Sequence, residues 1–273
     1  MESRTSIAFR MIKEAFGDEG VIAILYYLER VTFTRAESPI LCISGKAATG
    51  KTTLGRILSG FDSPDQERFD YGLAETETLK YASKCFGKSD HIFHIDYFSN
   101  GHEANRYFVE SLYNNNELKT ILTGIEIPRS LRFYSKTINI DIKKREFQED
   151  EKELYEKAVR TAFLIGDKVG KQIRETRHFA RGKSNEAKII SDDFYLSYTN
   201  ASRGCREAER IVRNWRELVK TAVAWYQSGH FPFEVPYVRE ICEKGLQRQL
   251  NVLKEAMKNS DEETRHQQAP EGC

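Results

Sequence analysis

The sequence contains no long apolar run. Its longest uninterrupted apolar stretch, Val21 to Leu28, is far shorter than the ~20 residues that a helix needs to cross a bilayer. Glu2, Arg4 and Glu14 also interrupt the apolar segment that a secretion signal would require. We therefore expect no membrane partner.

Cysteine is scarce, and neither sign of charge dominates. The 273 residues include five cysteines and no C-x-x-C pair, which argues against a disulfide framework or a zinc cluster and favours a reducing, cytoplasmic compartment. The 42 Lys and Arg residues balance 41 Asp and Glu residues, so the net charge is +1. Without a strong positive field, nucleic acid is not an expected partner.

The sequence does contain a phosphate-binding pattern. Five apolar or β-tolerant residues, Ile40 to Ser44, form a predicted strand that leads into Gly45. The fixed positions of the motif G-x-x-x-x-G-K-[ST] are filled by Gly45, Gly50, Lys51 and Thr52. Apolar residues at helical spacing follow, so the motif lies between a strand and a helix, the context that this loop requires.

The residue types of this loop explain its expected chemistry. Glycines adopt backbone conformations closed to other residues, so the loop amides can surround phosphate groups at the positive end of the following helix. Lys51 would reach the β- and γ-phosphates, and the Thr52 hydroxyl would bind Mg²⁺. The expected cofactors are ATP and Mg²⁺, and the expected nucleotide-binding residues are Gly45, Lys46, Ala47, Ala48, Thr49, Gly50, Lys51, Thr52 and Thr53.

Helical and strand patterns alternate after the loop, which predicts an α/β protein with a mostly parallel sheet sandwiched by helices. Further strands are expected at His91–Phe98, Lys119–Thr123, Lys136–Ile142 and Ala187–Leu196. Helices are expected at 74–86, 103–113 and 149–181, the last with a break near Gly170, and at 205–227 and 235–258.

The same patterns predict the organisation of the chain. Residues 1–38 should form two short helices packed on the core, separated by a break at Gly17–Gly20, and residues 39–204 should form the core itself. Residues 205–258 should form helices that cover the sheet or make a homodimer surface. The polar stretch 259–273 is expected to be disordered.

Two further groups are candidates for chemistry. Asp96 ends a buried predicted strand, where open α/β sheets bind ligands, and it can act as a base, hold Mg²⁺ or simply cap a helix or turn. Arg174, Arg177 and Arg181 fall at i, i+3 and i+7, so they share one helical face and can converge on an anion. The alternative for the arginines is a solvated helix surface.

Together these features resemble the P-loop kinases of the nucleoside and nucleotide monophosphate type. Asp96-Tyr97-Phe98 is similar to the Asp-x-Phe-Tyr element of uridine-kinase-like families, where the aspartate faces the acceptor hydroxyl. Residues 174–193 resemble the lid of cytidylate-kinase-like enzymes, with an arginine helix, a small-residue turn and a strand, and the lid would span about 165–188. Thr123 departs from the pattern, since many relatives carry an acidic residue there.

The resemblance implies a phosphotransferase that moves the γ-phosphate of ATP to a small acceptor, a nucleoside monophosphate in the leading interpretation. Its catalytic residues would be Lys51, Asp96, Arg174, Arg177 and Arg181, with Thr52 and Asp96 holding the metal. The runner-up is a nucleoside kinase of the uridine type. The rival from another class is a regulatory or nucleic-acid-binding P-loop ATPase.

Overall fold

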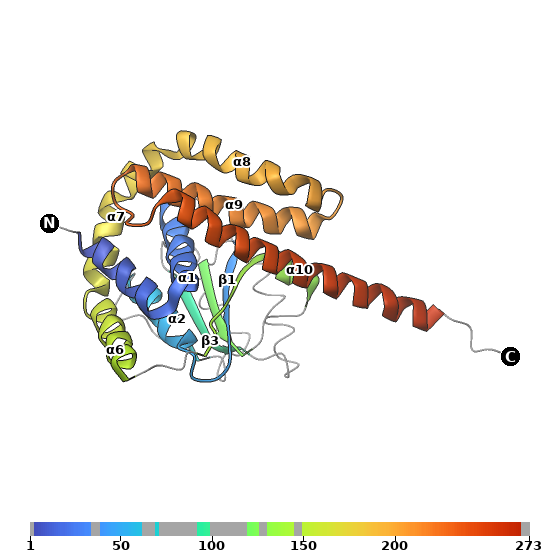
Figure 1. Cartoon of the computed structure of the whole chain (residues 1–273), viewed down its shortest axis with the longest axis horizontal. Helices are drawn as coiled ribbons and strands as arrows, with labels where there is room; N and C mark the ends of the chain where they lie inside the picture. Colours follow the sequence, from blue (N-terminus) through green and yellow to red (C-terminus); the bar gives the residue numbers. More distant parts are fainter. Residues whose placement is uncertain are drawn as a thin grey trace.

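The computed structural model describes residues 3–33, 39–61, 69–70, 92–98, 119–125, 130–144 and 149–268 (Figure 1). Its strands are β1 (Ile40–Ser44), β2 (Phe69–Asp70), β3 (Ile92–Phe98), β4 (Lys119–Gly124) and β5 (Thr137–Asp141). Its helices are α1 (Arg4–Thr32), α2 (Lys51–Gly60), α5 (Leu131–Ser135), α6 (Glu149–Leu164), α7 (Gly166–Gly182), α8 (Ser184–Ser202), α9 (Arg206–Gln227) and α10 (Val235–Gln268). The helices predicted at 74–86 and 103–113 lie outside the described residues.

The strands form one parallel sheet in the order β2-β3-β4-β1-β5. The four strands predicted before residue 145 are confirmed, and so is the parallel α/β architecture. β4 lies between β1 and β3, so the strand of the phosphate loop and the strand of Asp96 are not neighbours. Because all pairs are parallel, the carboxyl ends of β1, β3, β4 and β5 meet at one edge of the sheet.

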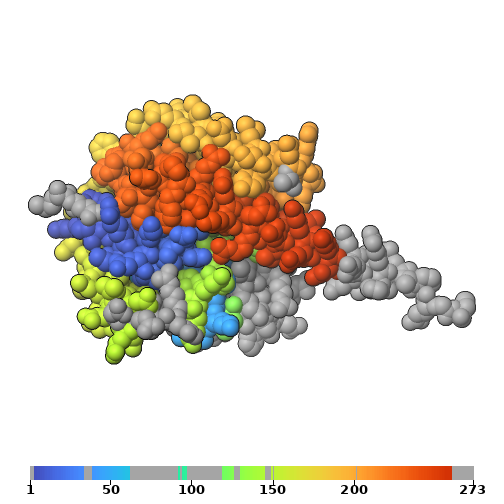
Figure 2. Space-filling view, viewed as in Figure 1, coloured from blue at the N-terminus to red at the C-terminus, as the bar shows by residue number. Residues whose placement is uncertain are grey.

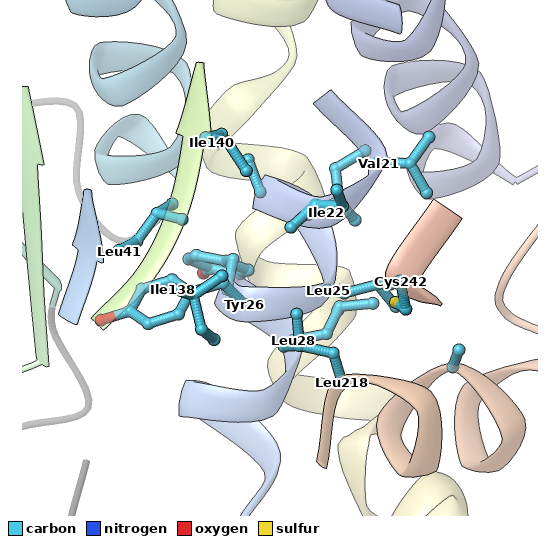
Figure 3. Close-up of a cluster of buried hydrophobic side chains, with 14 of the residues drawn as sticks. Val21, Ile22, Leu25, Tyr26, Leu28, Leu41, Ile138, Ile140, Leu218 and Cys242 are labelled. Carbon is cyan, nitrogen blue, oxygen red and sulfur yellow. The ribbon is translucent and has the colours of Figure 1, made fainter. Parts of the chain in front are cut away.

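Both faces of the sheet are buried. Leu41 in β1 and Ile138 in β5 are register partners, so their side chains point to the same side, where they pack with residues of α1 such as Tyr26 (Figure 3). Cys42 and Leu122 alternate with these positions and are each only 2% exposed. β1, β4 and β5 are therefore covered on both sides, and they bury the polar residues Thr120, Thr137 and Asn139 among their apolar ones.

Helix α1 runs through the centre of the apolar core. Gly17 has non-helical backbone angles (φ 66°, ψ −145°) and divides the helix into two segments. Within the second segment, Val21 to Leu28 is buried, and the Tyr26 hydroxyl donates a hydrogen bond to the carbonyl of Thr120 in β4 at 2.8 Å. The longest apolar run of the sequence is thus a core helix, and no helix within the described residues is both long and apolar enough to cross a membrane.

The C-terminal helices α8, α9 and α10 pack together on one side of the molecule (Figures 1 and 2). α9 and α10 contact β5, and α8 packs on α9. The strand predicted at Ala187–Leu196 is wrong, because α8 is helical from Ser184 to Ser202. The disorder predicted from residue 259 is wrong up to Gln268, because α10 continues to that residue. The break predicted near Gly170 instead lies at Ile165, between α6 and α7.

Candidate nucleotide-binding site

The loop between β1 and α2 has the backbone of an anion-binding site. Gly45, Ala48 and Gly50 have positive φ angles of 146°, 59° and 88°. A Cβ atom at position 45 would lie 2.4 Å from the carbonyl oxygen of Ile142, so only glycine fits where the loop leaves β1. Lys46, Ala47 and Ala48 are exposed, which leaves the crest of the loop open at the start of α2.

Lys51 is held inside this loop. Its side chain is 9% exposed, and Nζ donates a hydrogen bond to the carbonyl oxygen of Lys46 at 2.6 Å. Burial lowers the pKa of the Lys51 ammonium, and the carboxylates of Asp96 and Asp141 oppose that shift. A phosphate in the loop would supply a stronger, charged acceptor, so the lysine is arranged to exchange its carbonyl partner for an anion.

Thr52 and Asp96 meet at the carboxyl edge of the sheet. The Thr52 hydroxyl donates a hydrogen bond to Asp96 Oδ1 at 2.9 Å. The Thr123 hydroxyl donates to the same oxygen at 2.5 Å, and the Asp96 side chain is buried, at 5% exposed. Thr123 lies one residue before the end of β4, the strand between β1 and β3, and so it bridges the gap that the strand order creates.

This donor set suits Mg²⁺ in the presence of a nucleotide. Mg²⁺ prefers oxygen ligands and is usually held by one or two carboxylates together with substrate phosphates and water. Among the described residues, no group of three or more His, Cys, Asp or Glu side chains could hold a metal alone. Thr52 and Asp96 supply a hydroxyl and a carboxylate beside the loop, and the phosphates of a nucleotide would complete such a site.

The remaining predicted loop residues also lie at the site. Thr49 Oγ1 donates to the Lys46 carbonyl at 3.0 Å, which tightens the loop. Thr53 follows Thr52 in the first turn of α2 and is partly exposed. The full predicted set from Gly45 to Thr53 therefore forms one continuous loop and helix start.

The three arginines do not lie at the loop. Arg174 Nη1 donates to the Phe61 carbonyl at 3.2 Å, beyond the C-terminal end of α2, whereas the phosphate loop precedes its N-terminal end. α2 has ten residues, which separates its ends by ~15 Å. Arg177 and Arg181 donate to the carbonyls of Val31 and Thr32 at the end of α1.

The expected lid is corrected in one respect. The sequence predicts a strand for the segment that follows the small-residue turn, and this segment is a helix. The three arginines bind backbone carbonyls, which are the unsatisfied acceptors at helix C-termini. Cations there also interact favourably with the negative end of the helix dipole. In this structure these arginines join α7 to α1 and to α2. Their expected role at the transferring phosphate stays a prediction.

Three residues of the site do not stand out in the sequence as site residues. Thr123 is visible there only as a departure from the kinase pattern, and Asp141 and His94 match no motif that would assign them to the site. Asp141 ends β5 and accepts a hydrogen bond from Ser44 Oγ at 3.1 Å, immediately before the loop. The signal that could have found them is that polar residues near the ends of parallel strands gather at the same edge as the loop.

Comparisons with known proteins agree with the coarse assignment. No protein-family model matches the chain. Over 70 residues, 26% of this chain, it is 36% identical to a probable anion import ATP-binding protein of Haloferax volcanii, and the match spans 22% of that relative. The solved structure of an active helicase, SCCmec type IV Cch, is similar with a TM-score of 0.50 at 12% identity, covering 91% of this chain and 48% of the helicase chain.

The chain therefore spans less than a quarter of the curated relative and about half of the helicase. At 12% identity the structural likeness concerns the fold alone. The phosphate-binding loop, the parallel sheet and these two similarities together indicate a P-loop NTPase. Neither of these two proteins is described as a kinase, so the specific resemblance to nucleotide kinases gains no support from them.

Proposed function

We propose that this protein is a P-loop ATPase that binds Mg-ATP in the loop of residues 45–53 and hydrolyses it. The observation that carries the proposal is the hydrogen bond between Thr52 and Asp96, 2.9 Å long, next to the buried Lys51. A hydroxyl from the loop and an aspartate from another strand of the sheet are the two protein ligands that P-loop NTPases use for Mg²⁺.

Each residue has a defined task in this proposal. The loop amides and Lys51 bind and orient the phosphates, and the low-dielectric surroundings of Lys51 strengthen its interaction with them. Mg²⁺, when bound, would neutralise charge on the β- and γ-phosphates. Asp96 and Thr52 would hold that ion, and Thr123 holds Asp96 in place through its 2.5 Å hydrogen bond. Such a site acts by positioning and charge stabilisation, without a covalent nucleophile.

Hydrolysis is favoured over transfer to a small acceptor by the arrangement of Asp96. One oxygen of its carboxylate already accepts hydrogen bonds from Thr52 and Thr123, which suits a metal-binding role better than a base for an acceptor hydroxyl. ATP is the proposed nucleotide because the curated relative is described as a probable ATP-binding protein. Phosphotransfer to a nucleoside monophosphate or nucleoside stays a prediction from the sequence.

The decisive experiment measures ADP release under three conditions: protein alone, with a panel of nucleosides and nucleoside monophosphates, and with single-stranded DNA or RNA. An ATPase should release ADP and phosphate in equal amounts without any acceptor. Acceptor-dependent ADP release with a phosphorylated product would replace this proposal by the kinase prediction. Stimulation by polynucleotides would identify the class of partner.

Lys51→Ala should abolish turnover, whereas Lys171→Ala should not, because Lys171 is 76% exposed on α7 and pairs with Glu175 at the surface. Binding can be measured independently of turnover. Mg-ATP at a hundredfold excess over Kd should stabilise the wild type by about 2.7 kcal/mol and leave Lys51→Ala unchanged. No stabilisation of the wild type by any nucleotide would refute the proposal.

A further inference from the structure

His94 lies behind Asp96, two residues earlier in β3, and contacts the same threonine. Its Nε2 atom is 3.0 Å from the Thr123 hydroxyl oxygen. That oxygen is in turn 2.5 Å from Asp96 Oδ1 and 3.3 Å from the Ile95 carbonyl oxygen. The imidazole, the hydroxyl and the carboxylate therefore form a continuous chain of hydrogen bonds that ends at Asp96, the proposed Mg²⁺ ligand.

The direction of this chain follows from the number of protons. A threonine hydroxyl has one proton to donate, and an ionised carboxylate can only accept. The 2.5 Å distance to Asp96 falls in the range of a charge-assisted O–H···O⁻ bond, so the Thr123 proton belongs to that bond. His94 must then donate its Nε2 proton to Thr123, which fixes the imidazole tautomer.

Helix α2 holds the imidazole in this position. Gly55 lies over the ring, and a Cβ atom at that position would be 2.5 Å from Nε2 and 2.6 Å from Cε1 of His94. The absence of a side chain at position 55 is what allows the ring to lie between α2 and β4. The same helix begins with Lys51 and Thr52, so the helix that packs against the ring also carries these two residues of the phosphate loop.

We infer that His94 is a positioning residue that orients Asp96 for Mg²⁺ through the Thr123 hydroxyl. This inference rests on the proposed function, because it assigns a role within that site. Groups that hydrogen-bond to metal ligands fix the ligand's orientation, and their loss typically lowers metal affinity or activity by about 10–100-fold. His94 itself contacts neither nucleotide nor metal in this arrangement.

The test compares His94→Leu, which removes the donor at similar size, with His94→Gln, whose amide can donate from nearly the same place. The readout is the affinity for a non-hydrolysable ATP analogue, measured once with Mg²⁺ and once with EDTA. The factor by which Mg²⁺ tightens binding should fall about 10–100-fold in His94→Leu and largely return in His94→Gln. Affinity in EDTA should stay at the wild-type value, because the loop is intact.

Gly55→Ala provides a second route to the same defect with His94 still present, because the added methyl group displaces the ring. The double variant Gly55→Ala/His94→Leu should be no worse than His94→Leu alone, since both changes act on one contact. In NMR spectra of the nucleotide-free protein, the His94 Nε2 proton should be visible, protected from exchange by its bond to Thr123. It should disappear in Thr123→Val.

The outcomes separate the inference from the proposed function. A folded His94→Leu protein with the wild-type response to Mg²⁺ would overturn the role of His94 while leaving the ATPase intact. If His94→Leu does not fold, a wild-type response to Mg²⁺ in Gly55→Ala would overturn that role equally. A protected Nε2 proton that persists in Thr123→Val would show that His94 donates elsewhere. Failure of the wild type to bind any nucleotide would instead remove the proposed function.

Discussion

The Thr52 hydroxyl and the Asp96 carboxylate, 44 residues apart in the sequence, are joined by a hydrogen bond of 2.9 Å. This bond connects the first turn of α2 to the end of β3 across the strand that separates β1 from β3. It brings together the two protein groups expected to hold Mg²⁺, and it leaves Lys51 beside them to meet the phosphates.

Asp96→Asn should separate the charge of this residue from its shape. Asparagine keeps an oxygen that can accept from both threonines, so the fold should survive, but it removes the negative charge that a metal requires. We expect turnover to fall on the order of 10²–10⁴-fold, the range for a positioned catalytic acid or base. Nucleotide affinity should also lose its dependence on Mg²⁺. Near-normal turnover in a folded Asp96→Asn protein would reduce the residue to a structural role.

The charged Lys51 side chain should lower the free energy of unfolding of the nucleotide-free protein. Burial lowers its pKa, so the folded protein binds this proton less tightly than the unfolded chain does. The resulting cost is fully present at neutral pH, where lysine is charged in both states, and disappears as pH rises to the ordinary value of about 10.4. When the ammonium is removed, the Lys46 carbonyl keeps the hydrogen bond that it accepts from Thr49 Oγ1.

Lys51→Met should therefore raise the midpoint of thermal unfolding at pH 7. The stabilisation by Mg-ATP should be lost in the same variant. Calorimetry at pH 7 and at pH 10 provides the check, because the advantage of methionine should shrink at the higher pH. A lower midpoint for Lys51→Met at pH 7 would contradict this account.

The phosphate loop and its flanking strand and helix were predictable because their signals are local. Glycine positions and an apolar strand specify the loop without reference to the rest of the chain. The order of the strands is not encoded in this way, since any parallel sheet accepts β4 at either side of β1. The contact between Asp96 and Thr123 depends on that order and so could not be predicted from local patterns.

The error at α8 has a different cause. Ile189 and Ile190 form a short apolar pair that favours a strand, yet they are 73% and 38% exposed. Ala187, Ser191 and Phe194 are buried, recur at helical spacing and place one face of α8 on α9. Short apolar runs do not distinguish a buried strand from an exposed helix surface, and packing against α9 decides the outcome.

The arginines of α7 should contribute to stability and not to turnover. Arg177 and Arg181 donate to the carbonyls of Val31 and Thr32, so replacing either by alanine leaves a helix end unsatisfied. We expect Arg177→Ala and Arg181→Ala to lower the free energy of unfolding by about 1–3 kcal/mol each. Urea denaturation measures this loss, with Arg160→Ala as control, because Arg160 is 79% exposed on α6.

Turnover separates this role from the one that the kinase resemblance implies. An arginine that stabilises charge on the transferring phosphate can be worth about 10³–10⁵ in rate. If either variant stays as stable as the wild type and loses turnover to that extent, α7 closes over the nucleotide and the structural role is wrong. Unchanged turnover in a less stable protein would place both arginines at the end of α1 throughout the reaction cycle.

Gln249 of α10 should be the most sensitive contact between the C-terminal helices and the sheet. It is 2% exposed, and its Oε1 accepts hydrogen bonds from the Trp215 indole N–H at 2.9 Å and from the backbone N–H of Asn139 in β5 at 3.4 Å. Its Nε2 donates to the carbonyls of Thr137 and Tyr134 at 2.9 and 3.3 Å. One side chain thus satisfies backbone groups at the edge strand, where the sheet has no further partner among the described strands.

Gln249→Leu keeps a similar volume but leaves these buried donors and acceptors without their partner. We expect the free energy of unfolding to fall by about 3 kcal/mol, since each buried polar group left unsatisfied costs about 1–3 kcal/mol and some will rearrange. Gln247→Leu is the matched control, because Gln247 lies on the same helix and bonds to Asn251 at the exposed surface. Equal unfolding midpoints in urea for the two variants would show that Gln249 does not hold α10 against β5. A selective loss in Gln249→Leu, with nucleotide binding retained at low temperature, would show that this glutamine secures the C-terminal layer without taking part in the site.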